Sequence, residues 1–183
     1  MNAEVSNSVL VDAVLSRICH DLIGSFGTAQ MAMESEELSK INSEEITIAK
    51  DCINQAIAKL EIFKVIFKNQ IISEKSTQII QNFILSRNLD CTINKSIATP
   101  ALIFFFVQKM ISSSSVKFEM NQIMLKKFFL TQEEIDILSG KALSITAGTI
   151  LAYLAFLQFR DLHKLSIEKQ EENNWIIQIH NLT

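Results

Sequence analysis

SRICHDLIGSFGTAQ, residues 16–30, is the stretch that decides the fold of the first part of this chain. It lies inside a longer segment, residues 9–33, in which apolar residues recur at spacings of three and four. That spacing places them on one face of an α-helix, so the segment is predicted to form one long amphipathic helix. The residues of this apolar stripe are Val11, Val14, Leu15, Ile18, Leu22, Phe26, Ala29 and Met33.

A second helical pattern follows a polar stretch. Asn42 and Glu45 have the spacing of a capping box, which predicts a helix that begins near Ser43. Its apolar residues continue to about Gln70, so the two helices are expected to form an antiparallel hairpin. A hairpin leaves half of each stripe in water unless it packs on the rest of the chain or on a second copy. We favour a second copy, which predicts a dimeric four-helix bundle. The apolar residues of the second stripe are Ile46, Ala49, Ile53, Ala56, Leu60, Phe63 and Phe67.

The rest of the chain alternates short apolar stretches with helical ones. The chain is therefore predicted to be α+β, with a helical hairpin domain over residues 1–72 and an α/β sandwich over residues 73–183. Thr99 followed by Pro100 is typical of a helix start. The predicted elements are helices over residues 76–88, 101–112 and 144–160, a helix between a Thr131–Glu134 capping box and Gly140, strands over residues 91–96 and 116–120, and a hairpin over residues 164–180.

Composition argues against several classes of protein. The net charge is −3, with 17 Lys and Arg against 20 Asp and Glu, and no basic run resembles a surface that follows a phosphate backbone, so nucleic acid is not expected as a partner. The apolar stretches at residues 101–110 and 145–159 are shorter than the ~20 residues that cross a bilayer. The amino terminus has no signal-peptide pattern, and the three cysteines show no metal-ligand spacing. We therefore expect a cytoplasmic protein without its own metal or cofactor.

His20 falls on the side of the predicted helix away from the apolar stripe. At about 100° per residue, Ile18 and Leu22 lie opposite it, so the imidazole is expected to be exposed. An interior glycine costs roughly 0.5–1 kcal/mol relative to alanine, and two glycines on this face indicate that clearance matters there. We expect the face to admit the backbone of a docking partner. The neighbours of His20 on it are Ala13, Ser16, Gly24, Gly27 and Met31.

Asp21 directly follows His20 and supplies a carboxylate. A carboxylate that accepts a hydrogen bond from one ring nitrogen fixes the tautomer and makes the other nitrogen a better nucleophile. His20 is thus a candidate phosphoryl acceptor, and the alternative is an ordinary surface histidine. Arg17, one turn earlier, is either a contact for phosphate or a partner, or a solvated charge.

These residues carry a resemblance to a known family. LSRICHDLIGSFGTAQMAME, residues 15–34, resembles the H-box helix of the ChpT-type histidine phosphotransferases of alphaproteobacteria, which have an Arg-x-Cys-His-Asp-Leu run. IAKLEIFKVIFKNQ, residues 57–70, is similar to the basic and aromatic end of that family's second helix. One departure is Gly24-Ser25, where the family often has Ser-Pro.

The resemblance implies a fold and a function. It implies a dimerising hairpin followed by a degenerate form of the ATP-binding domain of histidine kinases, with His20 as phosphoryl acceptor and Asp21 as the acid that orients it. It also implies that the donor is the receiver domain of a hybrid histidine kinase and that the acceptors are response regulators of the cell cycle. The Mg²⁺ ion needed for transfer is expected in the receiver.

Two other functions stay open. A residual ATP-dependent kinase needs glycine-rich loops around phosphates, but no Asp-x-Gly-x-Gly lies between residues 116 and 131, and Gly140 and Gly148 stand apart. A non-catalytic helical adaptor is the second alternative. Gly24 stands where a polar residue able to place water is expected in a phosphatase, so hydrolysis of a phosphorylated partner should be weak.

Other residues receive plainer interpretations. His163 and His180 are expected to be surface histidines, because no ligand partners stand at metal spacing. Cys19 is predicted to turn toward the core flank and pack there. The cluster Phe104–Phe106 is predicted to be core.

Overall fold

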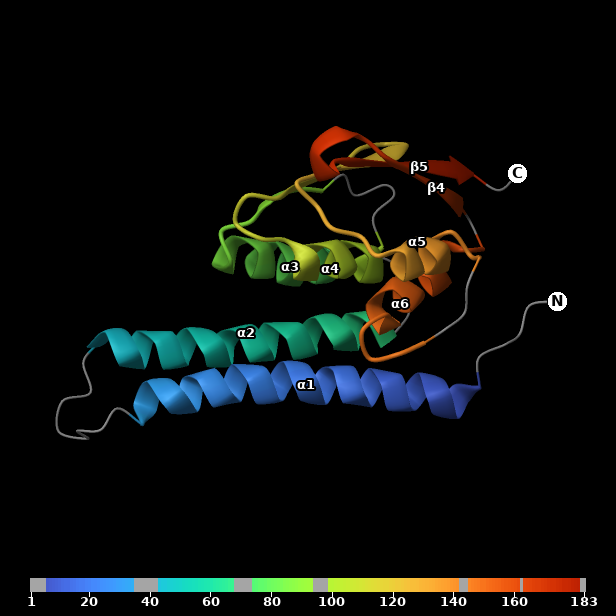
Figure 1. Cartoon of the computed structure of the whole chain (residues 1–183). Helices are drawn as coiled ribbons and strands as arrows, with labels where there is room; N and C mark the ends of the chain where they lie inside the picture. Colours follow the sequence, from blue (N-terminus) through green and yellow to red (C-terminus); the bar gives the residue numbers. More distant parts are fainter. Residues whose placement is uncertain are drawn as a thin grey trace.

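The computed structural model describes residues 6–34, 43–67, 74–93, 99–141, 145–161 and 163–181 of the chain. Figure 1 shows them stacked in layers: a helical hairpin, a layer of helices above it, and a sheet that covers the helices on the far side. The predicted α+β class is confirmed.

The hairpin consists of α1 (Asn7–Met33) and α2 (Ser43–Phe67), which lie alongside each other (Figure 1). The Ser6 side chain caps α1 by accepting a hydrogen bond from the Val9 backbone N–H at 3.4 Å. Both predicted helices are confirmed within the described residues. Asn42 of the predicted capping box and the predicted domain boundary at residue 72 lie outside them.

The sheet has five strands in the order β1-β2-β3-β5-β4. β1 and β2 run parallel, and the other neighbours run antiparallel. Alternate residues of the central strands point into the core, as with Val116 opposite Leu125. The strands are β1 (Asp90–Thr92), β2 (Ser115–Phe118), β3 (Gln122–Lys126), β4 (His163–Lys169) and β5 (Trp175–Asn181).

The middle layer fills the space between the sheet and the hairpin with aromatic side chains. Phe106 meets Phe118 of β2 and Phe128 edge-on, with ring centroids 6.1 and 5.8 Å apart, and Phe63 of α2 meets Phe104 at 5.3 Å. The predicted core role of Phe104–Phe106 is confirmed. The helices of this layer are α3 (Glu74–Ser86), α4 (Pro100–Lys109), α5 (Gln132–Leu138) and α6 (Ile150–Phe159).

The predicted caps of the middle layer are present. Thr99 accepts from the Leu102 N–H at the start of α4, and Thr131 and Glu134 form the complete capping box of α5. Gly140 follows the end of α5 with φ +73°, a conformation that favours glycine.

Two predicted helices have other bounds in the structure, and one strand was missed. β3 was not predicted, and α4 ends at Lys109 rather than at residue 112. α6 begins at Ile150 rather than at residue 144, because the Thr146 and Thr149 side chains bond the backbone of each other's turn before the helix starts.

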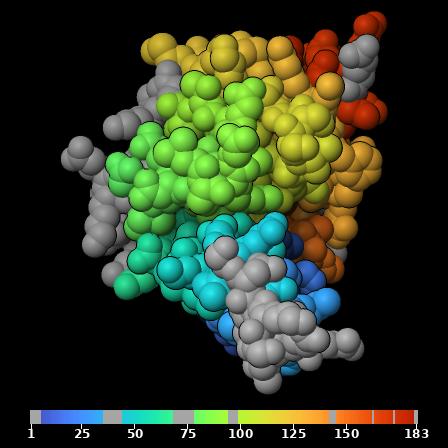
Figure 2. Space-filling view, turned by 90° about the vertical axis from the view of Figure 1, so that its left-hand side faces the viewer, coloured from blue at the N-terminus to red at the C-terminus, as the bar shows by residue number. Residues whose placement is uncertain are grey.

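The hairpin and the α/β part share one continuous core. Ala13, Ile62 and Phe63 belong to the same buried cluster as the residues of the sheet. Figure 2 shows the atoms of α2 directly beneath those of α3. Gln158 of α6 joins the parts with two hydrogen bonds: it accepts from the Ala101 N–H at 2.9 Å and donates to the Ile66 carbonyl at 3.2 Å.

The hairpin still presents apolar side chains to solvent. On α2 the stripe splits in two: Ala49, Ala56 and Phe63 are buried, whereas a second set at intervals of seven residues is exposed. Four residues of the predicted α1 stripe are exposed as well. The exposed members of the two stripes are Val11, Leu15, Phe26, Met33, Ile46, Ile53, Leu60 and Phe67.

Candidate functional site

His20 lies near the middle of α1 with its side chain 82% exposed. Its Nδ1 is 3.5 Å from Oδ1 of Asp21, so this ring nitrogen faces a carboxylate. The other nitrogen, Nε2, is then left to face outward. The expected exposure of the imidazole is confirmed.

Asp21 is buried, although it directly follows the exposed histidine; its side chain is only 8% exposed. Nε of Arg17, one turn earlier, donates to Asp21 Oδ2 at 3.3 Å. The carboxylate thus has one oxygen toward an arginine and the other toward the imidazole. A buried charge needs such partners, because desolvation without them is costly.

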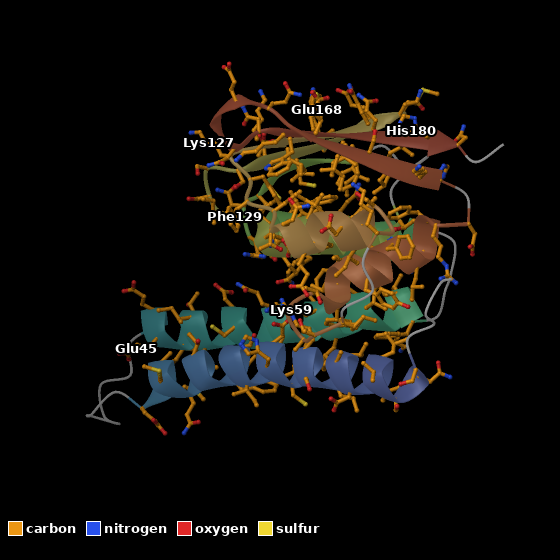
Figure 3. The ribbon with its side chains drawn as sticks, turned by 45° about the vertical axis from the view of Figure 1, so that its right-hand side comes forward. Glu45, Lys59, Lys127, Phe129, Glu168 and His180 are labelled. Carbon is orange, nitrogen blue, oxygen red and sulfur yellow. The ribbon has the colours of Figure 1, made fainter. Side chains whose placement is uncertain are left out.

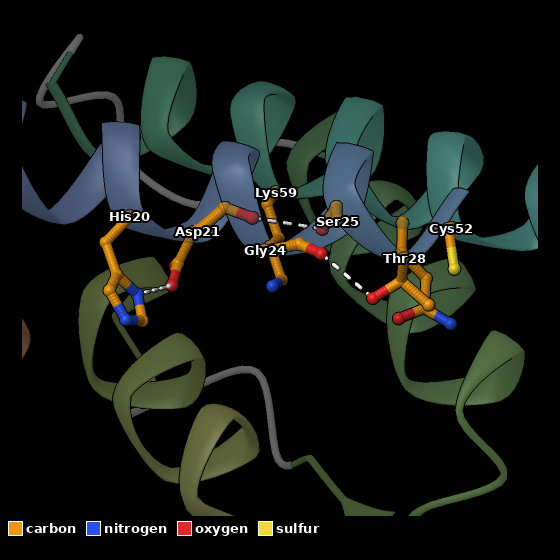
Figure 4. A pocket seen from close by; sticks show the side chains of 8 residues that line it. His20, Asp21, Gly24, Ser25, Thr28, Cys52 and Lys59 are labelled. Carbon is orange, nitrogen blue, oxygen red and sulfur yellow. Dashed lines mark hydrogen bonds and ion pairs between the residues drawn. The ribbon is translucent and has the colours of Figure 1, made fainter. Parts of the chain in front are cut away.

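A groove of about 240 Å³ lies between α1 and α2 beside this pair. In Figure 4 the His20 ring, the Asp21 carboxylate and the Lys59 side chain project to the same side of α1. Hydroxyl groups along the groove are held by α1 itself: Ser25 donates to the Asp21 carbonyl and Thr28 to the Gly24 carbonyl, each at 3.0 Å. The groove is lined by His20, Asp21, Gly24, Ser25, Thr28, Cys52, Gln55 and Lys59.

Lys59 is the cation of this groove. Burial lowers the pKa of Lys59 below its usual value; the Asp21 carboxylate acts in the opposite direction, and the charges of Arg87 and Arg17 lower the pKa further. Figure 3 places Lys59 near the middle of the hairpin, well away from Glu45 at its end. The site therefore combines a nucleophilic ring, a buried acid and a half-buried amine.

Comparison with known proteins gives a structural relative. No protein-family model matches the chain, and no curated protein matches its sequence. Among solved structures, the chain is similar to one described as "1.7 Angstrom Structure of a Bacterial Phosphotransferase", with a TM-score of 0.73 and 17% sequence identity over 97% of this chain and 98% of that one. The two chains share a fold.

Most of the residues predicted for a docking face around His20 are accessible, and one needs a correction. Ser16, Gly24 and Met31 are exposed, and Gly27 is half-buried. A Cβ atom on either glycine would meet nothing within 4 Å, so the chain itself does not require glycine there. Ala13 was predicted on this face and is instead buried, 6% exposed, within the cluster shared with the α/β part. Seven residues turn a helix face by only about 20°, so Ala13 keeps the direction of His20 and is buried because the core shared with the α/β part covers this end of α1.

Arg17 and Cys19 also differ from the plainer interpretations. The solvated-charge interpretation of Arg17 is wrong, because Arg17 is half-buried and paired with Asp21, whereas its contact with phosphate or a partner stays a prediction. Cys19 was predicted to pack, but it is exposed. Cys91 is different, because burial raises the pKa of its thiol to about 12 and keeps it protonated and unreactive.

The remaining histidines lie far from the site. His163 pairs with Asn181 at 3.0 Å and His180 with Ser166 at 2.8 Å, and both belong to the last strand pair, where Figure 3 shows His180 on the far side of the molecule from the hairpin. Within the described ranges, no group of three or more His, Cys, Asp or Glu could hold a metal ion. None of the described helices is long and apolar enough to cross a membrane.

Sequence reasoning missed the part of the groove that α2 supplies. Cys52, Gln55 and Lys59 follow one another at spacings of three and four, which puts them on one helix face. That spacing is visible in the sequence. The register of α2 against α1, which brings this face beside His20, is not.

Proposed function

We propose that this chain is a histidine phosphotransferase, which relays a phosphoryl group between aspartates of receiver domains through a phosphohistidine at His20. The observation that carries the proposal is the contrast between neighbours: an exposed imidazole whose Nδ1 faces a buried carboxylate. This contrast suits a nucleophile that a partner must reach and that its own chain must orient. The fold shared with a bacterial phosphotransferase supports the same activity.

The chemistry follows from the ring. Nδ1 carries the proton and points it at Asp21, and the lone pair of Nε2 attacks the phosphorus of a receiver's aspartyl phosphate. The N–P bond forms while the acyl P–O bond breaks, and the aspartate of the receiver leaves as a carboxylate. The positive charge that develops on the ring is stabilised by the Asp21 carboxylate. The reverse reaction on a second receiver returns the imidazole, so catalysis is mainly positioning and charge neutralisation.

The partners are the receiver of a hybrid histidine kinase as donor and response regulators of the cell cycle as acceptors, with Mg²⁺ held by the receiver. Ser16, Gly24, Gly27 and Met31 form the docking face around His20 in this proposal, and it needs no cofactor in this chain. The protein acts in the cytoplasm.

The active form in this proposal is a homodimer. The exposed α2 residues at intervals of seven, together with the exposed α1 stripe, match the spacing of a helix seam, and two copies would bury them in a four-helix bundle. The α/β part is then a degenerate relative of a kinase ATP-binding domain that retains a structural or docking role.

The test is transfer from a phosphorylated receiver domain, without ATP, to the wild-type protein and to His20→Ala. His180→Ala is the matched control, since it removes another exposed histidine. Acid-labile, base-stable label on the wild type and on the control, but not on His20→Ala, is the expected result.

Other outcomes discriminate the alternatives. No label on the wild type from any receiver, with dimer and docking intact, favours the helical adaptor. Label that requires ATP and no receiver favours the residual kinase.

A further inference from the structure

The Lys59 ammonium has room beside His20 and no ion-pair partner among the residues that the structure describes. It enters the groove from α2, on the side to which the imidazole projects (Figure 4). Across the described ranges, no carboxylate lies within 4.0 Å of it, because Asp21 is paired with Arg17 and contacts His20 instead. A lysine stem is long and flexible, so the ammonium can follow a group that arrives on the ring.

The charges around Lys59 are unbalanced. Arg17 and Arg87 act on it with the same sign, and among the described residues the Asp21 carboxylate opposes them. Arg87 is itself held in place, with Nη1 donating to the Val107 carbonyl at 3.3 Å and its guanidinium over the Phe83 ring. The region therefore carries an excess of positive charge on a protein whose net charge is negative. Such an excess stabilises an added anion.

A phosphoryl group on a side chain brings about two negative charges and three acceptor oxygens. We propose that Lys59 binds the phosphoryl group while His20 carries it, so that the groove between α1 and α2 is the phosphoryl-binding site of the relay. This inference rests on the proposed function and names the residue that receives the charge. Lys59 comes from the second helix of the hairpin, so the nucleophile and its cation are brought together by the pairing of α1 with α2.

The role of Lys59 in the step is electrostatic. When Nε2 takes the phosphoryl group and the carboxylate of the donor leaves, the negatively charged phosphoryl oxygens would lose their contact with the Mg²⁺ ion expected in the receiver. A cation at the groove compensates for the lost metal contact. Lys59 forms and breaks no covalent bond, and it keeps its proton throughout.

The experiment loads His20 without any receiver. Potassium phosphoramidate is the donor: its P–N bond breaks, ammonia leaves, and the phosphoryl group bonds to the imidazole. The pKa of the phosphoryl group on His20 is then followed by ³¹P NMR in the wild type, Lys59→Gln, Lys59→Arg and Lys50→Gln. Lys50 is the matched control because it is an exposed lysine of α2 that lies nine residues, or about two and a half turns, before Lys59 and therefore on the opposite face of the helix.

Removal of the cation should raise the pKa of the phosphoryl group by about 0.5 unit or more in Lys59→Gln, since a neighbouring positive charge stabilises the dianion. Lys59→Arg and Lys50→Gln should titrate like the wild type. A merely structural role of Lys59 would not move this pKa. Equal titrations in Lys59→Gln and the wild type would overturn the inference while the phosphohistidine itself stands.

A second measurement needs no variant. The pKa of Lys59, followed through its ¹⁵Nζ signal in the unmodified protein, should rise when His20 is phosphorylated, because the coupling between two sites is reciprocal. An unchanged Lys59 pKa would contradict the inference. Absence of any phosphohistidine on the wild type is a different result, because it would contradict the proposed function and with it the role of Lys59.

Discussion

At the scale of residues, the site joins one exposed group to one buried group across a single peptide bond. His20 faces solvent, and Asp21 faces inward, where Arg17 neutralises it. Consecutive helix residues lie about 100° apart, so this difference needs no unusual backbone. A change at Asp21 should therefore affect the chemistry of His20 without changing its exposure.

Asp21→Asn tests this coupling. The amide has no charge to stabilise the imidazolium or to hold the proton on Nδ1, so phosphorylation of His20 by phosphoramidate should slow by about 10²-fold. The rate is measured by ³¹P NMR or by mass spectrometry, with circular dichroism to verify the fold. Asp12→Asn, an exposed aspartate of the same helix, is the control and should keep the wild-type rate. A wild-type rate in Asp21→Asn would contradict the orienting role.

The sequence was sufficient to find His20 and Asp21, because adjacent residues need no tertiary information. It was not sufficient for the role of Arg17: the spacing of four residues allows a pair with Asp21, but the burial of Asp21, which gives that pair its importance, is not visible in the sequence. It also failed for Lys59, which lies 39 positions after His20 in the chain and reaches the site only through the packing of two helices.

At the scale of elements, α1 combines a regular helix with two interior glycines that its own packing does not require. A Cβ on Gly24 or Gly27 would meet open space. Alanine is a better helix former than glycine, so α1 is less stable with glycine at these two positions than it would be with alanine. In the proposed function, these glycines leave clearance for a docking partner, and this role predicts opposite effects of alanine on stability and on docking.

Gly24→Ala should raise the free energy of unfolding by roughly 0.5–1 kcal/mol, measured by chemical denaturation with far-UV circular dichroism. Transfer from a phosphorylated receiver should slow, because the added methyl group obstructs the approach of the partner. Phosphoramidate is too small to need docking, so its reaction with His20 is the internal control and should not change. Receiver transfer at the wild-type rate would show that clearance is not the purpose of this glycine.

Elements whose signals are local could be predicted. Both hairpin helices, the caps at Thr99 and Thr131 and the final strand pair follow from short sequence patterns. The first residue of α6 did not, because Thr146 and Thr149 compete with the helix for backbone hydrogen bonds. β3 was missed because five residues that alternate weakly between polar and apolar resemble a loop until β2 and β5 lie on either side of them.

At the scale of the whole molecule, the apolar stripes of the hairpin are divided between two uses. One set of α2 residues joins the core shared with the α/β part, and the other set remains at the surface. The sequence predicted the stripes but not this division, since periodicity shows which residues share a face and not what covers it. The exposed set is the surface on which the proposed dimer depends.

Phe26→Asp should convert the dimer to a monomer in sedimentation velocity. Burial of a phenylalanine contributes roughly 1.5–3 kcal/mol, and a symmetric interface contains the residue twice, so the loss should weaken association by at least about 10²-fold. Leu85→Asp is the control: it places the same charge on an exposed apolar residue of α3, outside the hairpin. A Phe26→Asp protein that remains dimeric would exclude this face as the interface.

The origin of the groove residues in one polypeptide has a genetic consequence. His20, Asp21 and Lys59 all line a groove between α1 and α2 of the same chain. Two alleles, one that encodes His20→Ala and one that encodes Lys59→Gln, should therefore fail to restore wild-type transfer when expressed together, since no pairing of their products contains an intact groove. An assembly whose sites are shared between subunits would regain part of its activity from such mixed pairs.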